Sequence, residues 1–237
     1  MIRVTNLVKS YNKKNVIDIN ELIINDGEIF GLVGNNGAGK TTLLRLMLDL
    51  ISSDRGSVFS NNFAVSKSEG WKDYTASYLD EGFLIDFLTP EEYFSFIALE
   101  YGISKEETER RLTGFSDFFN GEVLGQKKKY IRDFSKGNRQ KIGIASSLIT
   151  VPRVLILDEP FNSLDPSSQI LLKQILKEYN RESNAAIIVS SHDLNHVTEI
   201  CSRIAIIEKG VIIRDLMNDG NAMTELAGYF SVKQQKS

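Results

Sequence analysis

A glycine-rich loop between an apolar segment and a helix-like segment constrains the fold of this chain more than any other feature. Residues 34–41 read Gly-Asn-Asn-Gly-Ala-Gly-Lys-Thr and match the P-loop pattern G-x-x-x-x-G-K-S/T. Residues 29–33 are typical of a buried strand, and residues 42–48 have helical spacing. Glycines in such a loop let backbone N–H groups surround phosphate oxygens, and the helix N-terminus favours negative charge. The pattern predicts phosphate binding rather than an ordinary glycine turn.

The last residues of this loop carry side chains with chemistry of their own. Lys40 is predicted to reach the β and γ phosphates of a nucleoside triphosphate, and the Thr41 hydroxyl to coordinate Mg²⁺. The predicted nucleotide-binding residues of this segment are Gly34, Asn35, Asn36, Gly37, Ala38, Gly39, Lys40, Thr41 and Thr42.

Two adjacent carboxylates follow a second apolar segment, residues 154–157. Ligands in open α/β sheets bind at the carboxyl ends of strands, so Asp158 is predicted to hold Mg²⁺ directly or through water. Successive side chains on an extended strand face opposite ways, so Glu159 is predicted to face an attacking water as general base. Two such acids alone would be better explained as solvated, but together with the P-loop they favour ATP hydrolysis.

The remaining patterns predict an α/β fold of the P-loop NTPase type with a mostly parallel central sheet. Residues 1–30 alternate apolar and polar positions, which predicts short antiparallel strands in an N-terminal β subdomain. The apolar runs 154–157 and 185–189 are typical of strands buried on both faces of a parallel sheet. Residues 204–207 and 211–213 predict a terminal hairpin.

Between these strands lies a stretch with helical character. Residues 89–92 and 104–107 both have the spacing of a capping box, the first with proline at the first helical position. This stretch is predicted to be an inserted helical subdomain. The predicted organisation is a single domain of residues 1–237, with a catalytic core of 1–81 and 135–215, a helical subdomain of 82–134 and a C-terminal tail of 216–237.

The segment Phe134-Ser135-Lys136-Gly137-Asn138 resembles the signature L-S-G-G-Q of the ABC transporter nucleotide-binding subunits, and the resemblance covers about residues 1–215. It implies that two subunits pair head to tail. Ser135 and the backbone N–H of Gly137 would then contact the γ-phosphate of ATP held by the P-loop of the other subunit. Taken alone, the segment is equally well explained as a helix start that Ser135 caps.

Three further residues match the family. Asp165, in Ser163-Leu164-Asp165, resembles the end of the D-loop that crosses the dimer interface, and it is also placed to cap the following helix. His192, after the 185–191 strand, resembles the switch histidine that contacts the γ-phosphate and helps to position the attacking water. Tyr11 resembles the aromatic residue that stacks on adenine, the alternative being an ordinary strand aromatic.

The chain departs from the family pattern at Glu81, where glutamine is usual, and at Phe134 and Lys136 in the signature. An ionised glutamate can bind Mg²⁺ or water through oxygen but cannot donate a hydrogen bond. With ATP and Mg²⁺ as the implied cofactors, the predicted catalytic residues are Glu159, His192, Lys40 and Glu81, and the predicted metal ligands are Thr41, Asp158 and Glu81.

The resemblance implies an ATPase that drives transport, and the signature variants resemble the exporter branch linked to drug and antibiotic efflux. The implied partners are an integral-membrane subunit and a second nucleotide-binding subunit, identical or different, which would place the chain on the cytoplasmic face of the cell membrane. The lone Cys201 and the lack of a signal-like N-terminus agree with the cytoplasm. Apolar residues 82–88 are predicted either to dock the membrane partner or to pack inside the helical insert.

Other functions agree less well with the sequence. A net charge of −3 and one short basic run, residues 127–129, give no electrostatic reason to bind nucleic acid. A soluble ABC ATPase acting on a macromolecule is the main alternative, although the chain has one P-loop and no sustained heptads. A P-loop kinase or GTPase would leave the signature segment and His192 without a role. A zinc site at His192 and His196 lacks the glutamate and third histidine expected of it.

Overall fold

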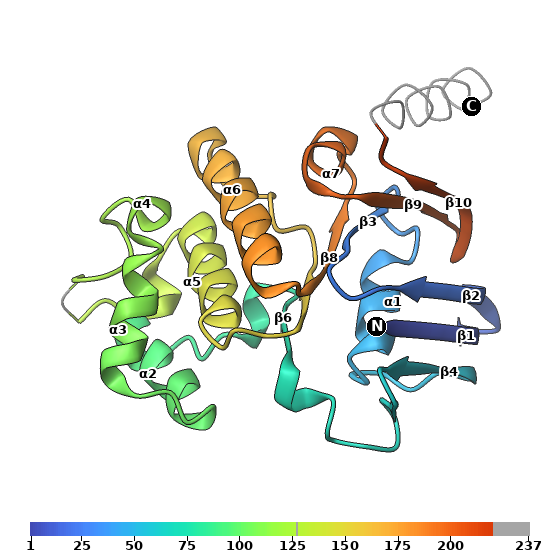
Figure 1. Ribbon diagram of the computed structural model, residues 1–237, viewed down its shortest axis with the longest axis horizontal. Coiled ribbons are helices and arrows are strands. Elements are labelled where there is room, and N and C mark those ends of the chain that lie inside the picture. The colour runs from blue at the N-terminus through green and yellow to red at the C-terminus, as the bar shows by residue number, and fades with distance from the viewer. Residues whose placement is uncertain (127, 220–237) are drawn as a thin grey trace.

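The structure is a computed structural model that describes residues 1–126 and 128–219, and it places helices beside two β-sheets (Figure 1). Residues 220–237 of the predicted tail lie outside the described residues. One sheet has the order β2-β1-β4-β5 and the other β10-β9-β3-β8-β7-β6. The strands are β1 Ile2–Tyr11, β2 Lys14–Ile24, β3 Ile29–Val33, β4 Arg55–Ser60, β5 Phe63–Ala64, β6 Thr75–Tyr78, β7 Val154–Leu157, β8 Ala186–Ser191, β9 Arg203–Glu208 and β10 Val211–Met217.

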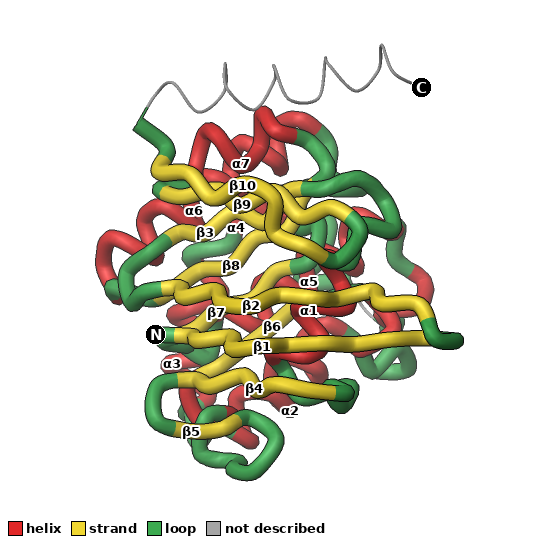
Figure 2. The backbone as a smooth tube through the Cα atoms, turned by 90° about the vertical axis from the view of Figure 1, so that its right-hand side faces the viewer, coloured by secondary structure: helices red, strands yellow, loops and turns green. Residues whose placement is uncertain are grey.

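The N-terminal sheet is antiparallel, as the alternating pattern predicts (Figure 2). Its first two strands are longer than predicted, with 10 and 11 residues. They turn tightly through Asn12 and Lys13, which both have positive φ, 50° and 64°. Two left-handed residues match the twist of a two-residue hairpin, so pairing continues up to the turn. Polar side chains near that turn interrupt the alternation of apolar and polar residues, and the sequence therefore predicted shorter strands.

The central sheet is mostly parallel, with β10 added antiparallel at one edge. The predicted α/β fold class is confirmed. Val33 of β3 pairs with Ser191 of β8, and Leu157 of β7 pairs with Val189 of β8. The three strands therefore end close together at one edge of the sheet, where the loops that follow them meet.

Helices cover this sheet and extend to one side of it, where α2, α3 and α4 lie together (Figure 1). Thr89 and Glu92 form both halves of the predicted capping box at the start of α2. At α3 the prediction was half wrong: Ser104 caps the helix, but the Glu107 carboxylate bonds Arg110 and Arg111 instead, because guanidinium donors form stronger, charge-assisted bonds. The helices are α1 Lys40–Met47, α2 Pro90–Glu100, α3 Lys105–Thr113, α4 Ser116–Phe119, α5 Lys136–Leu148, α6 Pro166–Ser183 and α7 Leu194–Ile200.

Helix α5 is held close to the sheet by a glycine. A Cβ atom at Gly143 would lie 2.2 Å from Cε2 of Tyr78, so the tyrosine ring of β6 packs directly on the helix backbone. Real Cβ atoms do not approach other atoms this closely. The contact ties α5, which follows the signature-like loop, to the strand that precedes Glu81.

Candidate functional site

The glycine-rich loop links β3 to α1 in a conformation that requires glycine. Gly39 precedes the helix with φ 112°, in the left-handed region that side chains disfavour. A Cβ at Gly34 would lie 2.4 Å from the Ile207 carbonyl oxygen of β9, so the loop begins against the neighbouring strand. The backbone N–H groups at the start of α1 are left free of side-chain caps, which is the arrangement expected for anion binding.

The loop lines a pocket of about 240 Å³. Tyr11, at the end of β1, lines it with 48% of its surface exposed, and Lys9 Nζ lies 5.3 Å from the centroid of its ring. Val16 of β2 also lines the pocket. The full lining is Tyr11, Val16, Asn35, Asn36, Gly37, Ala38, Gly39, Lys40, Thr41, Thr42 and Glu159.

Thr41 and Asp158 lie in contact, although 117 residues separate them in the chain. The Thr41 hydroxyl donates to Asp158 Oδ2 at 2.5 Å, and the Ser190 hydroxyl of β8 donates to Oδ1. Asp158 is buried, and this burial raises the pKa of its carboxyl, while the two hydroxyl donors act in the opposite direction. The edge of the central sheet thus holds a carboxylate and a hydroxyl side by side.

These oxygen donors fit Mg²⁺. Magnesium is commonly held in proteins by one or two side-chain oxygens, with waters and phosphate oxygens completing its octahedron. Thr41 and Asp158 supply such a pair beside the phosphate loop. Within residues 1–126 and 128–219, no group of three or more His, Cys, Asp and Glu side chains gathers as a metal cage. The site fits a metal that arrives with a phosphate ligand.

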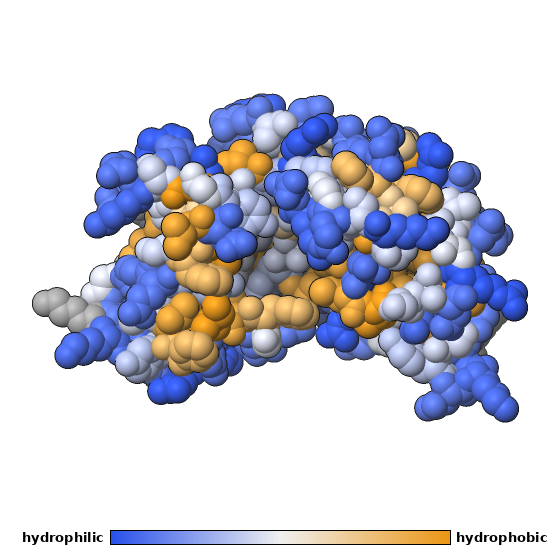
Figure 3. Space-filling view, turned by 90° about the horizontal axis from the view of Figure 1, so that it is seen from below, coloured by the Kyte–Doolittle hydropathy of each residue, from blue (hydrophilic) through white to orange (hydrophobic). Residues whose placement is uncertain are grey.

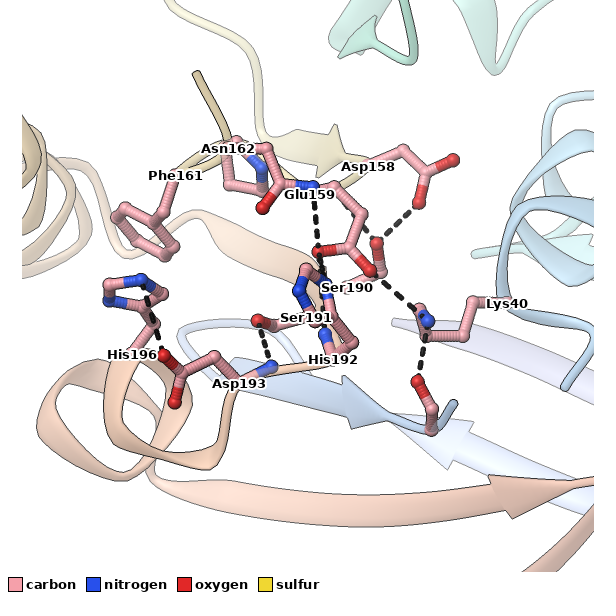
Figure 4. A network of polar contacts seen from close by, with 12 residues as sticks. Lys40, Asp158, Glu159, Phe161, Asn162, Ser190, Ser191, His192, Asp193 and His196 are labelled. Atoms are coloured by element: carbon pink, nitrogen blue, oxygen red, sulfur yellow. Dashed lines mark hydrogen bonds and ion pairs between the residues drawn. The ribbon is translucent and has the colours of Figure 1, made fainter. Parts of the chain in front are cut away.

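Glu159 lies at the centre of a polar cluster (Figure 4). Its Oε1 lies 3.1 Å from Lys40 Nζ as an ion pair without hydrogen-bond geometry, and its Oε2 lies 2.9 Å from His192 Nδ1. The backbone N–H of His192 donates to the same Oε2 at 3.3 Å. Lys40 Nζ also donates to the Gly34 carbonyl at 2.6 Å. The carboxylate therefore bridges the phosphate loop and the residue that follows β8.

The two adjacent acids face different partners, as predicted, but for a different reason. Strand β7 ends at Leu157, and Glu159 adopts a left-handed backbone with φ 49°. Its N–H donates to Ser190 Oγ at 2.9 Å, which supports this unusual conformation. A kink in the backbone, rather than strand alternation, turns Glu159 toward Lys40 and His192.

The two histidines point to different partners (Figure 4). His192 precedes α7 and contacts Glu159, whereas His196 lies within α7 and packs on the Phe161 ring, with centroids 4.7 Å apart. Burial lowers the pKa of His196. Because only one of the two is helical, their four-residue spacing does not place them on one helix face.

Ser135 and Gly137 stand apart from this cluster. Neither lines the pocket, and α5 lies across β6 from α1 (Figure 1). Ser135 caps α5, since its hydroxyl accepts from the Asn138 N–H at 3.2 Å. A Cβ at Gly137 would lie 2.6 Å from the Ser163 carbonyl oxygen, so the helix start packs tightly on the loop after β7. The alternative interpretation of this segment, a helix start that Ser135 caps, is thus confirmed.

Comparison with known proteins shows the family to which the chain belongs. The ABC transporter family pattern matches residues 17–162. The chain belongs to the ABC transporter ATP-binding family. It is 33% identical to the uncharacterised ABC transporter ATP-binding protein YhcH of Bacillus subtilis, over 99% of this chain and 76% of the relative. It is therefore an ABC ATPase domain with a site for ATP.

Other relatives differ in what their names describe. Bacitracin transport ATP-binding protein BcrA of Bacillus licheniformis is 31% identical over 92% of this chain and 70% of its own. Methionine import ATP-binding protein MetN of Francisella tularensis is 34% identical over 90% and 63%. A solved structure described as the ATP-binding subunit of an ABC transporter superposes with a TM-score of 0.83 and 29% identity, covering 95% of this chain and 94% of the other.

In this ABC domain Asp165 is used by the fold. It caps α6 by accepting from the Ser168 N–H at 3.0 Å, and its Oδ2 lies 3.8 Å from Nζ of the buried Lys141 in α5. Hydrogen bonds from Ser167 and Ser168 hold the pKa of Asp165 well below its usual range. The second interpretation of Asp165, as a helix cap, is confirmed.

Within residues 1–126 and 128–219, the ion pair of Glu81 is with a helix residue and not with the Thr41 and Asp158 pair. Glu81 begins a short 3-10 turn after β6, and its Oε1 lies 3.7 Å from Arg139 Nη2 of α5. About a third of its surface is exposed, 31%. Of the predicted site residues, the structure thus unites the P-loop, Tyr11, Asp158, Glu159 and His192, and places Ser135, Gly137, Asp165 and Glu81 elsewhere.

Sequence reasoning missed two polar residues that support the site. Ser190 bonds both Asp158 and the Glu159 N–H, and Gln140 of α5 donates to the Pro160 carbonyl. Both are buried. A serine late in an otherwise apolar strand was a signal for the first, because a buried hydroxyl needs a partner. Nothing local in the sequence distinguished Gln140.

Proposed function

We propose that this ABC domain is the motor subunit of an exporter: it binds Mg-ATP, pairs with a second nucleotide-binding subunit, and hydrolyses ATP to drive a separate membrane subunit. The observation that carries the proposal is the Glu159 cluster. One carboxylate contacts both the P-loop lysine and His192, beside a buried acid that touches Thr41. That constellation offers a base, a phosphate-binding cation and two metal ligands around one pocket.

The chemical roles follow from these contacts. Lys40 would exchange its carbonyl and Glu159 partners for β- and γ-phosphate oxygens, which are stronger acceptors. Glu159 would then be free to accept a proton from the attacking water, and His192 to hold the γ-phosphate end of the site. Mg²⁺, held by Thr41 and Asp158, would neutralise charge on the phosphates. Tyr11 would stack on adenine at the pocket rim.

The dimer is proposed because the signature residues of this chain do not line its own pocket. Ser135 and Gly137 lie at the N-terminus of a 13-residue helix and do not line the pocket of their own chain. A second subunit facing head to tail would place them on its neighbour's γ-phosphate, with Asp165 between the two sites. The same arrangement can be made by two identical subunits or by two different ones.

A surface near Glu81 supports a membrane partner. Phe83 and Phe87 are 53% and 63% exposed, whereas Leu84 between them is buried, so the 82–88 segment serves both the core and the surface. Phe83 also lines a hollow of about 360 Å³ with Trp71, Tyr78 and Tyr101. Figure 3 shows apolar side chains gathered on the underside of the molecule. Exposed apolar groups of this kind suit a protein partner.

Export and a peripheral location complete the proposal. Export is supported by the signature variants Phe134 and Lys136, and the relatives named for both bacitracin transport and methionine import mean that direction must be tested. Among the described residues, no helix is long and apolar enough to cross a membrane. Attachment to the cytoplasmic face of the cell membrane would therefore come through the partner subunit.

The decisive test is Glu159→Gln, which keeps the shape of the side chain but removes the base. ATP binding should persist, turnover should fall by about 10²-fold or more, and an ATP-bound dimer should accumulate in light scattering. Glu178→Gln, at an exposed position of α6, is the matched control and should behave as wild type. Turnover near the wild-type rate in Glu159→Gln would remove Glu159 as the base.

Docking is tested separately, by co-purification of the tagged chain with its membrane subunit from native membranes. Phe83→Asp and Phe87→Asp should each reduce recovery of that subunit while leaving nucleotide binding intact. Phe63→Asp, exposed by 38% on the other sheet, is the control. If both variants recover as much of the membrane subunit as wild type does, the 82–88 segment only packs inside the helical insert and does not dock the partner. Inverted vesicles containing the complex would show direction by ATP-driven uptake.

A further inference from the structure

The side chain of Lys9 joins the end of β1 to the loop that follows α1. Its Nζ donates to the Ser52 carbonyl oxygen at 2.7 Å and to Asp54 Oδ1 at 3.5 Å. The same ammonium group lies over the Tyr11 ring, 5.3 Å from the ring centroid. Only 16% of the Lys9 side chain is exposed. A cation that is held in place and partly removed from water is attracted to a ring face more strongly than a fully exposed one.

Asp54 holds the strand as well as the ammonium group. Its Oδ2 accepts from the Ser10 N–H at 2.6 Å, and its own N–H donates to the Val8 carbonyl oxygen at 2.8 Å. The loop after α1 is therefore bonded to the backbone of β1 on both sides of Lys9. These bonds fix the part of β1 that leads to Tyr11, together with the cation over its ring.

A β-bulge beside Lys9 brings its side chain and the pocket together. The register between β1 and β2 shifts between Lys9 and Ser10, because Val16 is an extra residue on β2. Since the extra residue is on β2, the side chains of β1 continue to alternate, and Lys9 and Tyr11 lie on the same side of the strand. Tyr11 and Val16 line the phosphate-loop pocket, and the lining does not include Lys9. The ammonium group thus supports the ring from outside the pocket.

We infer that Lys9 is a positioning residue for Tyr11, because the loop after α1 holds its ammonium group over the ring and so sets the ring for an adenine base. This inference rests on the proposed stacking of Tyr11 on adenine. A tyrosine ring has two faces, and a cation over one face leaves the other for a stacked base. A ring that is already ordered in the free protein loses less conformational entropy when ATP binds. Lys9 therefore increases the affinity for the base and not for the phosphates.

The test compares two ligands by isothermal titration calorimetry, a non-hydrolysable ATP analogue and inorganic tripolyphosphate, each with Mg²⁺. Lys9→Met removes the ammonium group and keeps an unbranched side chain. It should weaken binding of the ATP analogue by about two- to fivefold, the size of a partly exposed contact between a cation and a ring. Binding of tripolyphosphate should not change. In a Tyr11→Leu background, Lys9→Met should cause no further loss.

Matched variants separate positioning of the ring from a general effect of charge. Lys14→Met removes the same charge from an exposed residue that pairs with Tyr11 across the hairpin, and it should leave the ratio of the two affinities unchanged. Lys9→Arg keeps a cation that can lie over the ring and should restore affinity for the ATP analogue to within about twofold of wild type. Asp54→Asn leaves both Lys9 and Tyr11 in place, so it decides the question if Lys9→Met does not fold. It should weaken the ATP analogue by a smaller factor and spare tripolyphosphate.

The outcomes for Lys9 and for the site itself are distinguishable. Equal weakening of both ligands by Lys9→Met, an equal loss in the Tyr11→Leu background, or tighter binding of the ATP analogue would each overturn the inference. The same holds for Asp54→Asn if it shifts both ligands equally or neither. If Tyr11→Leu binds the ATP analogue as wild type does, the proposed stacking on adenine is wrong. A wild-type chain that does not bind the analogue would overturn the proposed function as a whole.

Discussion

The two halves of the proposed ATP site are built in different ways. On the P-loop side, Asp158 is buried, Thr41 and Glu159 are partly buried, and the three contact one another or the loop itself. On the signature side, Ser135 and Asp165 are each occupied as caps of their own helices. The first half is complete within one chain. The second is held in shape by the fold, and within this chain its groups serve local structure.

This difference predicts which mutations should affect activity alone and which should also affect stability. A substitution on the P-loop side should reduce ATPase activity without unfolding the protein. The carboxylates there are held in place by the strands, and the strands do not depend on them. A change on the signature side should cost stability as well as activity.

The largest effect is expected for Asp158→Asn. An amide would put an NH2 group in place of one of the two oxygens that accept from the Thr41 and Ser190 hydroxyls. It would also remove the charge that a metal needs, so turnover should fall by about 10²- to 10³-fold. Steady-state phosphate release measures it, with the exposed Asp117→Asn as control. If the loss is no greater than that from Ser135→Ala, the two halves do not differ as described.

Gly137→Ala should have the next largest effect, on stability. Its Cβ would meet the Ser163 carbonyl oxygen at 2.6 Å, and such overpacking typically costs about 1–3 kcal/mol in the free energy of unfolding. Urea unfolding followed by circular dichroism measures this cost, with the neighbouring exposed Lys136→Ala as control. An unchanged unfolding midpoint would show that the glycine is free to move away from the loop after β7.

Two substitutions at Ser135 should separate its role as a helix cap from its proposed role at the other subunit's phosphate. Ser135→Ala loses the α5 cap, which should cost about 1 kcal/mol, and also loses the hydroxyl proposed for the other subunit's phosphate. Ser135→Asn should restore the cap, because asparagine is an equally good one, but not turnover. Thermal unfolding and ATPase assays on both variants distinguish these roles. Full recovery of turnover in Ser135→Asn would mean that the residue acts only as a cap.

The smallest effect concerns Asp165 and pH. Its pKa is lowered in the folded protein, so ionised Asp165 stabilises the fold above its ordinary pKa of 3.8, and this stabilisation is lost as pH falls below that value. Asp165→Asn keeps the cap without the charge. The stability difference between wild type and Asp165→Asn should therefore shrink on acidification from about pH 6 to about pH 3. A constant difference would show that the charge is not linked to folding.

Much of this architecture was predictable from sequence because its signals are local. The P-loop pattern, the apolar strand before Asp158 and the Thr89 cap depend on neighbouring residues, and the fold class followed from them. The left-handed backbone of Glu159 was not predictable, because Ser190, 31 residues away, supports it. Likewise, Glu107 bonds arginine partners rather than completing its capping box. Which of several possible hydrogen-bond partners a side chain takes depends on the three-dimensional geometry, and a sequence pattern does not give that geometry.

The order of strands in the central sheet has a consequence for synthesis of the protein on the ribosome. Strand β8 lies between β3 and β7, yet its residues, 186–191, are translated after both. The strand that carries the P-loop and the strand that leads to Asp158 therefore have no direct pairing, and they must wait for β8 to join them. Non-local pairing of this kind is slow, and it exposes unpaired strand edges meanwhile. A nascent chain thus gains its complete nucleotide pocket only after residues 186–191 have been made, and ATP binding marks a chain in which β8 has joined β3 and β7.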